Sequence, residues 1–113
     1  MATVSYVSDL SAQTTGQSVS VTATATAGTT LHTYSGAGAD IIKLWAANTS
    51  SAAVLLTVEW GSVTAAKNIV VSIPAYSGPV CIADRRECAN GTVAAFAATT
   101  AVINCWGEVW NAA

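Results

Sequence analysis

Charged side chains are what this chain lacks most. Only 9% of its 113 residues are Asp, Glu, Lys or Arg, and the formal net charge is -2 at pH 7. Soluble domains usually have about a quarter of their residues charged. Binding to nucleic-acid phosphates requires clustered basic residues, and the only adjacent basic pair, Arg85 and Arg86, is flanked by Asp84 and Glu87. We therefore expect no nucleic-acid partner.

Long apolar runs are also missing, and the first residues are not expected to act as a secretory leader. Hydrophobic residues make up 52% of the chain, but no run approaches the roughly 18 apolar residues that a membrane-spanning helix needs. The opening MATVSYVSDLSAQTTGQ has neither the basic start nor the apolar centre of a signal peptide. We expect no membrane partner, and a protein that stays in the compartment where it is made.

Metal-binding and disulfide-forming residues are few, with three cysteines and one histidine. An odd cysteine number argues against a secreted disulfide framework. The spacing of Cys81 and Cys88 is not that of a zinc ribbon or finger, so a zinc site built with Cys105 and His32 is disfavoured. A bridge between Cys81 and Cys88, formed after release into an oxidising medium, is favoured over zinc. We predict no metal site and no cofactor.

Catalytic patterns are equally sparse. His32 could form a hydrolytic triad with Ser35 and either Asp9 or Asp40, but no serine lies in a nucleophile motif such as G-x-S-x-G. The glycine-rich stretch at 36–40 leads into a strand pattern, whereas a dinucleotide-binding loop opens a helix. The sequence predicts that the protein is not an enzyme, and that His32 is a structural or surface residue.

Alternating small apolar and polar residues are abundant instead. From Ser18 onward, valine and alanine alternate with serine and threonine, which predicts a half-buried strand over 17–26. Further strands are expected over 29–34, the two arms of 41–61, 68–74, 80–82, 93–98 and 102–110, with a charged turn at 83–88. Because Gly, Pro and Asn turns separate them and no helical pattern appears, we predict an all-β, single-domain antiparallel β-sandwich, jelly-roll-like, with about eight strands.

The polar segment 1–16, broken by Gly16, shows no sustained period and is predicted to be an extended N-terminal arm. Residues 17–113 then form the sandwich domain.

Within 41–61, IIKLWAANTSSAAVLLTVEWG, two apolar arms flank a polar turn. This pattern predicts a hairpin whose inner face is continuous and whose outer face brings Lys43 near Glu59. A one-residue slip would bury both charges, so the register is strongly specified. The predicted inner pairs are Ala46 with Val54, Leu44 with Leu56 and Ile42 with Val58, extended by Trp60; the predicted outer pairs are Trp45 with Leu55, Lys43 with Thr57 and Ile41 with Glu59.

Four tryptophans divide between two environments. In 102–110, Trp106 and Trp110 alternate with apolar residues and share a face with Asn104 and Glu108. Trp45 belongs to the same group, whereas Trp60 is assigned to the core. Either another layer of the chain covers the outward tryptophans, or they contact another subunit or a host surface. The candidate oligomer or capsid contact residues are Trp45, Trp106, Trp110 and Tyr6.

Four segments carry a family resemblance: GTTLHTY, ADIIKLWAANTSSAAVLLTVEWG, IVVSIPAYSG and NGTVAAFAATTAVINCWGEV. In this order and spacing they resemble small all-β virion proteins of tailed bacteriophages, which are encoded among head genes and described as capsid decoration (cement) or minor structural proteins. The resemblance spans about residues 28–110, and NTSSAAVLLTVEWG is its most specific part. The chain departs from the pattern at CIADRREC and in its tryptophan-rich end.

The resemblance implies a capsid decoration protein on the outer head surface of a virion, made in the bacterial host cytoplasm. Its expected partners are other copies of itself, as a homotrimer, and the major capsid protein, with stabilisation by multivalent contacts. The alternative is a head-fibre or tail appendage module that binds host surface glycans. Copy number in the virion separates these two functions.

Overall fold

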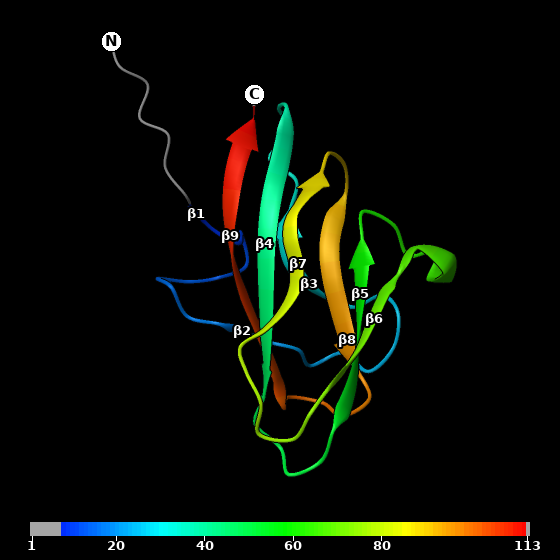
Figure 1. The fold of residues 1–113 in the computed structure, drawn as a ribbon. Helices are drawn as coiled ribbons and strands as arrows, with labels where there is room; N and C mark the ends of the chain where they lie inside the picture. The colour runs from blue at the N-terminus through cyan, green and yellow to red at the C-terminus, as the bar shows by residue number, and fades with distance from the viewer. Residues whose placement is uncertain (1–7, 113) are drawn as a thin grey trace.

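The computed structural model describes residues 8–112 and is an all-β sandwich of two antiparallel sheets (Figure 1). The predicted fold class is thus confirmed. No helix in this part of the chain is long and apolar enough to cross a membrane. The elements are β1 (Ser8–Asp9), β2 (Val19–Ser20), β3 (Thr29–Thr33), β4 (Ala39–Asn48), β5 (Val54–Trp60), the short 3₁₀ helix η1 (Ala65–Lys67), β6 (Ile69–Ile73), β7 (Val80–Cys88), β8 (Thr92–Ala97) and β9 (Ile103–Ala112).

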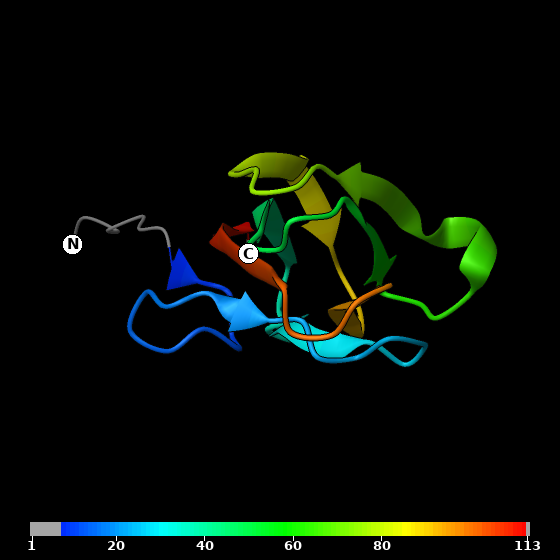
Figure 2. The same cartoon turned by 90° about the horizontal axis from the view of Figure 1, so that it is seen from below.

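The strand order is that of a jelly roll. The large sheet has the order β1-β9-β4-β7, with β2 also paired to β9, and the small sheet has the order β3-β8-β5-β6. Leaving out β1, the eight remaining strands divide equally between two facing sheets, as in jelly-roll domains. Figure 2 views the molecule from the end that carries the β4–β5 and β8–β9 connections, with η1 projecting at one side.

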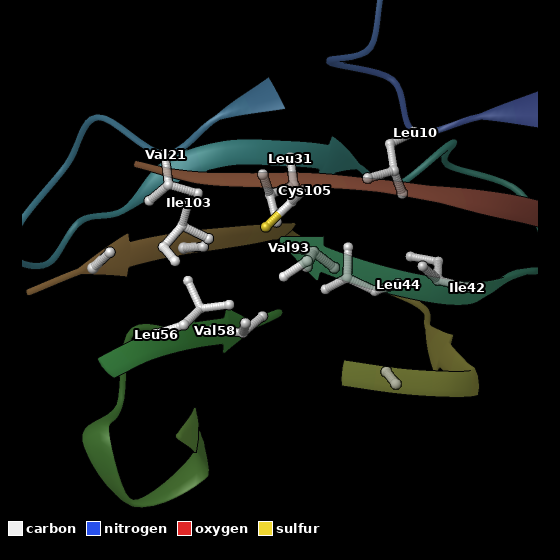
Figure 3. Close-up of a cluster of buried hydrophobic side chains, with 14 of the residues drawn as sticks. Leu10, Val21, Leu31, Ile42, Leu44, Leu56, Val58, Val93, Ile103 and Cys105 are labelled. Carbon is white, nitrogen blue, oxygen red and sulfur yellow. The ribbon is translucent and has the colours of Figure 1, made fainter. Parts of the chain in front are cut away.

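The core fills the space between the sheets. Ile42 and Leu44 of β4 and Leu56 and Val58 of β5 are fully buried, and their side chains point into the same space (Figure 3). Period-two alternation places every second residue of these strands inside. The other buried hydrophobic residues of this cluster are Leu10, Val21, Leu31, Ala46, Val54, Ile73, Ala83, Cys88, Val93, Ala95, Ala97, Ile103, Cys105 and Val109.

The predicted hairpin of 41–61 is wrong in its pairing, although its inner faces are right. β4 pairs with β7 and β9, whereas β5 pairs with β6 and β8, so the two arms lie in opposite sheets. Their apolar faces meet across the core instead of side by side. Asn48 fixes the crossover, because its Nδ2 donates to the carbonyls of Ala52 (2.9 Å) and Ile73 (3.0 Å).

The strand predicted over 17–26 is mostly absent. Only β2 is a strand there, and Ala25, predicted to face inward, is exposed. The chain leaves the sheet because the backbone N–H groups of Thr22 and Ala23 both donate to Oγ1 of Thr29. The hydroxyl oxygen of Thr29 thus takes the place of the backbone carbonyl that a neighbouring strand would offer to these N–H groups.

The charged turn predicted after Ile82 is also wrong, because β7 continues to Cys88. β7 is the outer strand of the large sheet, and its pairing with β4 is interrupted by register shifts. Asp84, Arg85, Arg86 and Glu87 are all exposed. Charges and irregular pairing are common features of edge strands, where they oppose pairing with other chains.

The described part of the predicted N-terminal arm, 8–16, packs on the sandwich. β1 pairs with β9, and Leu10 is only 1% exposed. The side-chain oxygen of Gln13 accepts hydrogen bonds from the backbone N–H groups of Leu10 (3.1 Å) and Gly107 (3.0 Å). This segment therefore closes one side of the core.

Leu10→Ala tests that closure. Removing a fully buried leucine side chain should lower the free energy of unfolding by about 2 to 5 kcal/mol. Thr14→Ala, an exposed position in the same segment, serves as the control and should leave stability nearly unchanged. Equal urea midpoints for the two variants would contradict the packing of this segment.

Candidate functional site

Three of the four candidate contact residues lie on one surface, the outer face of β4 and β9. We call this surface the aromatic face. Trp45 and Trp106 are directly opposite each other in the β4–β9 ladder, and Trp110 lies opposite Ile41. The fourth candidate, Tyr6, lies outside the described residues. The aromatic face consists of Ile41, Lys43, Trp45 and Ala47 from β4 and Asn104, Trp106, Glu108 and Trp110 from β9.

The aromatic face is held by the longest ladder of the molecule, with pairs from Ala39 opposite Ala112 to Asn48 opposite Ile103. The inward positions between its side chains are buried on both strands. At Gly107 the two strands approach so closely that an added Cβ would lie 2.3 Å from the carbonyl oxygen of Lys43. The three tryptophans thus lie on hydrogen-bonded strands above a packed core, and not on a loop.

All eight side chains of the aromatic face are half-buried. The rest of the described chain therefore does not cover them completely, as a second internal layer would. Lys43 lies over the ring of Trp45, 5.2 Å from its centroid, and its Nζ is 3.8 Å from Oδ1 of Asp84. Solvent-exposed ion pairs of this kind contribute little to stability, so Lys43 is available to another partner.

One end of the aromatic face is hollowed. Ile41, Trp110 and Arg85 line a depression of about 260 Å³. Its walls are an aliphatic side chain, an indole ring and the side chain of an edge-strand arginine. An apolar or aromatic group of another molecule fits this lining better than a charged one.

Trp60 is not part of the aromatic face, and it is also less buried than predicted. It is half-buried against the margin of the core at the end of β5. Its Nε1 donates to the carbonyl oxygen of Glu87 (2.8 Å), and Arg86 lies 5.4 Å from its ring centroid. Trp60 therefore joins the small sheet to the edge strand of the large one.

The histidine considered for a triad meets one of its proposed partners, Asp40. Nε2 of His32 is 2.8 Å from Oδ2 of Asp40, and both residues are buried. The hydroxyl of Ser35, however, donates to Oδ1 of Asp40 (2.7 Å) and not to the imidazole. Asp9 is engaged elsewhere, accepting from the backbone N–H of Gly16.

This arrangement cannot work as a serine triad. Nδ1 of His32 accepts the backbone N–H of Ser11 (3.0 Å), so the ring proton is on Nε2 and is donated to Asp40. Both ring nitrogens are therefore occupied, and neither can take a proton from Ser35. The group links β3 of the small sheet to β4 of the large sheet.

Asp40 is the centre of this network. Burial by itself would raise its pKa, but hydrogen bonds from His32, Asn111 and Ser35 to the carboxylate outweigh burial and lower the pKa to about 2. The side-chain amide of Asn111 in β9 donates to Oδ1 (2.9 Å). The carboxylate therefore stays charged throughout the range in which most proteins function, and it ties together three strands.

Glu59 has a different environment from the one predicted. It is 2% exposed, and Lys43, its predicted partner, lies on the other sheet. Its Oε1 accepts the backbone N–H of Gly28 (2.7 Å), and its Oε2 accepts the hydroxyl of Thr26. These bonds anchor the β2–β3 connection, beside an open depression of about 220 Å³ in which Glu59 is the only charged lining residue.

The bridge considered between Cys81 and Cys88 is not formed. All three cysteines are free, and these two lie on one strand, seven residues apart. Such a separation is roughly 23 Å along a strand, whereas bridged residues lie within about 7 Å. Burial raises the pKa of Cys105 to about 12, so this thiol is unreactive. Among residues 8–112, no group of three potential metal ligands occurs.

A second apolar surface was missed in the sequence. Leu55 and Val70 on the outer face of the small sheet are 48% and 55% exposed. Phe96 and Val70 both lie opposite Thr57, on either side of β5. The sequence signal for this surface is the alternation of these residues with the inward-facing ones.

No protein-family model matches the chain, and no curated protein or solved structure is significantly similar to it.

Asp40→Asn tests the role of the buried network. The carboxylate's lowered pKa contributes to stability above its unfolded value near 4, on the order of 2 kcal/mol, and this contribution is lost as pH falls toward about 2. In urea titrations, the free energy of unfolding of the parent should therefore fall between pH 4 and 2. The variant should be less stable than the parent at pH 7, and its stability should depend less on pH in the acid range. Asp84→Asn, on the exposed edge, is the control. Parallel acid profiles for parent and Asp40→Asn would contradict this role.

Proposed function

We propose that this protein is a non-enzymatic structural component of a tailed-bacteriophage virion, a capsid decoration (cement) protein. In this role it binds the outer head surface, and many copies stabilise the shell by weak, repeated contacts. The observation that carries the proposal is the aromatic face, with three half-exposed tryptophans on one ladder.

The composition of this face supports a protein–protein contact. Tryptophan is enriched at interface centres, where it buries a large apolar area with little loss of side-chain freedom. Trp45 and Trp106 form a contiguous pair, and Lys43 and Glu108 supply only one charge of each sign beside it. Such a surface suits a flat partner, another subunit or the shell, better than a small substrate.

The fold and the sequence resemblance support different parts of the proposal. Jelly rolls occur in viral capsid proteins and also in lectin domains. Since a fold alone does not specify a function, the assignment to a phage head depends on the resemblance over residues 28–110. Among residues 8–112, the imidazole of His32 contacts neither a serine hydroxyl nor a cysteine thiol, which is consistent with a non-enzymatic role.

Counting the copies in purified virions tests the proposal. A decoration protein should be present in hundreds of copies and should be released from the head under mild denaturation before the shell opens. Tens of copies or fewer, located on a fibre or tail, would contradict the proposal. That result would favour the appendage module, in which the aromatic face stacks against host sugars.

Trp106→Ala separates contact from folding. We expect it to preserve the β-fold and to weaken subunit or shell association by about 1 to 3 kcal/mol, the scale of an interface anchor. Trp60→Ala is the control, because it removes packing and the bond to Glu87, and should lower stability by about 3 kcal/mol. Melting curves and shell co-sedimentation on the same samples check this. If Trp106→Ala melts like Trp60→Ala yet binds shells like the parent, the aromatic face is internal packing.

A further inference from the structure

The aromatic face has an ordered pattern across its two strands. Three consecutive rows hold Trp45 opposite Trp106, Lys43 opposite Glu108, and Ile41 opposite Trp110. Each row thus places unlike charges, or two apolar groups, on neighbouring strands. A row of opposite charges lies between two apolar rows, and this order decides what kind of surface can cover the face.

We propose that the aromatic face pairs with the same face of a second copy of this chain. The two copies are related by a two-fold axis that lies in the interface, runs parallel to β4 and β9, and passes above the midline between these two strands. This inference rests on the proposed function and names one partner of the same surface. Two-fold axes are the commonest symmetry of homo-oligomers and require a self-complementary patch.

Charge complementarity selects this axis. Rotation about an axis along the strands exchanges the two strands and keeps each row in place. Lys43 then meets Glu108 of the second copy, and Glu108 meets the second copy's Lys43. An axis across the strands, through the same row, would instead place Lys43 on Lys43 and Glu108 on Glu108, which is unfavourable.

The apolar rows fit the same operation. Trp45 would meet Trp106 of the second copy, so the pair of tryptophans on each copy becomes a cluster of four. Trp110 of the second copy would lie over Ile41, at the hollow of about 260 Å³ that Ile41, Arg85 and Trp110 line. Aromatic pairs stabilise contacts beyond the area they bury.

Within one copy the two central charges do not satisfy each other. Lys43 is directed to the exposed carboxylate of Asp84, and Glu108 takes part in no salt bridge among residues 8–112. Glu108 is half-buried between two apolar rows. A second copy would supply the cation that its own chain does not.

A charge swap between copies tests the pairing. In a pair of identical copies, residue 43 of each copy faces residue 108 of the other. Lys43→Glu and Glu108→Lys each make both of these contacts like-charged, and each should weaken self-association about tenfold or more. In an equimolar mixture of the two variants, residue 43 of each copy again faces an opposite charge at residue 108 of the other copy. The mixture should therefore recover pairs that contain one copy of each variant, and the double variant should pair with itself.

The measurement is native mass spectrometry and sedimentation equilibrium of the isolated protein, with one variant labelled with heavy nitrogen. Lys67→Glu is the matched control: it makes the same charge change on the exposed residue that ends η1, away from the aromatic face, and should pair like the parent. Thermal melts establish that each variant folds.

Three results would overturn the pairing: a monomeric parent, a parent that forms trimers by head-to-tail contacts, or single variants that stay apart when mixed. The proposed function is tested separately by co-sedimentation with virion shells. A monomeric parent that binds shells refutes the pairing alone, and a paired parent that binds no shell refutes the proposed function alone.

Discussion

The ladder between β4 and β9 determines both the core and the aromatic face of this protein. Its ten residue pairs fix which side chains turn inward to the core and which turn outward. Because side chains alternate with a period of two, a slip of β4 by one residue would bury Lys43 and expose Ile42 and Leu44. The core therefore determines the arrangement of the outer face, although the two surfaces have no side chain in common.

A buried polar network holds this ladder to the rest of the sandwich. His32 of β3 donates to Asp40 of β4, and Asn111 of β9 donates to the same carboxylate. Ser11 in turn donates its backbone N–H to His32, so the segment after β1 joins the network. A half-satisfied network of this kind would be destabilising, whereas this one has a partner for each ring nitrogen and each carboxylate oxygen. Groups that in isolation suggested catalysis thus have a structural role.

Local alternation in the sequence predicted the fold class, the inward residues of β4, β5 and β9, and the common face of the outward tryptophans. It could not predict strand partners. Ile42 and Leu44 form the same apolar surface whether Leu56 lies beside them in a hairpin or opposite them across the core. Both arrangements bury these side chains, and only the crossover held by Asn48 distinguishes them.

The other errors have similar physical causes. The strand predicted over 17–26 ends early because Thr29 supplies a side-chain acceptor to the backbone of Thr22. Polar residues at 84–87 suggested a turn, but they suit an exposed edge strand equally well. Alternation assigned Trp60 to the core. Alternation does not show that Trp60 ends β5 at the margin of the core, where its indole N–H donates to the carbonyl of Glu87.

If the proposed function is right, the aromatic face is covered by protein in the assembled virion. Hydroxyl-radical footprinting of the tryptophans, in purified virions and in the dilute isolated monomer, tests it most directly. Trp45, Trp106 and Trp110 should become protected on assembly, while Trp60 changes little. Equal labelling of Trp106 in the monomer and the virion would contradict it.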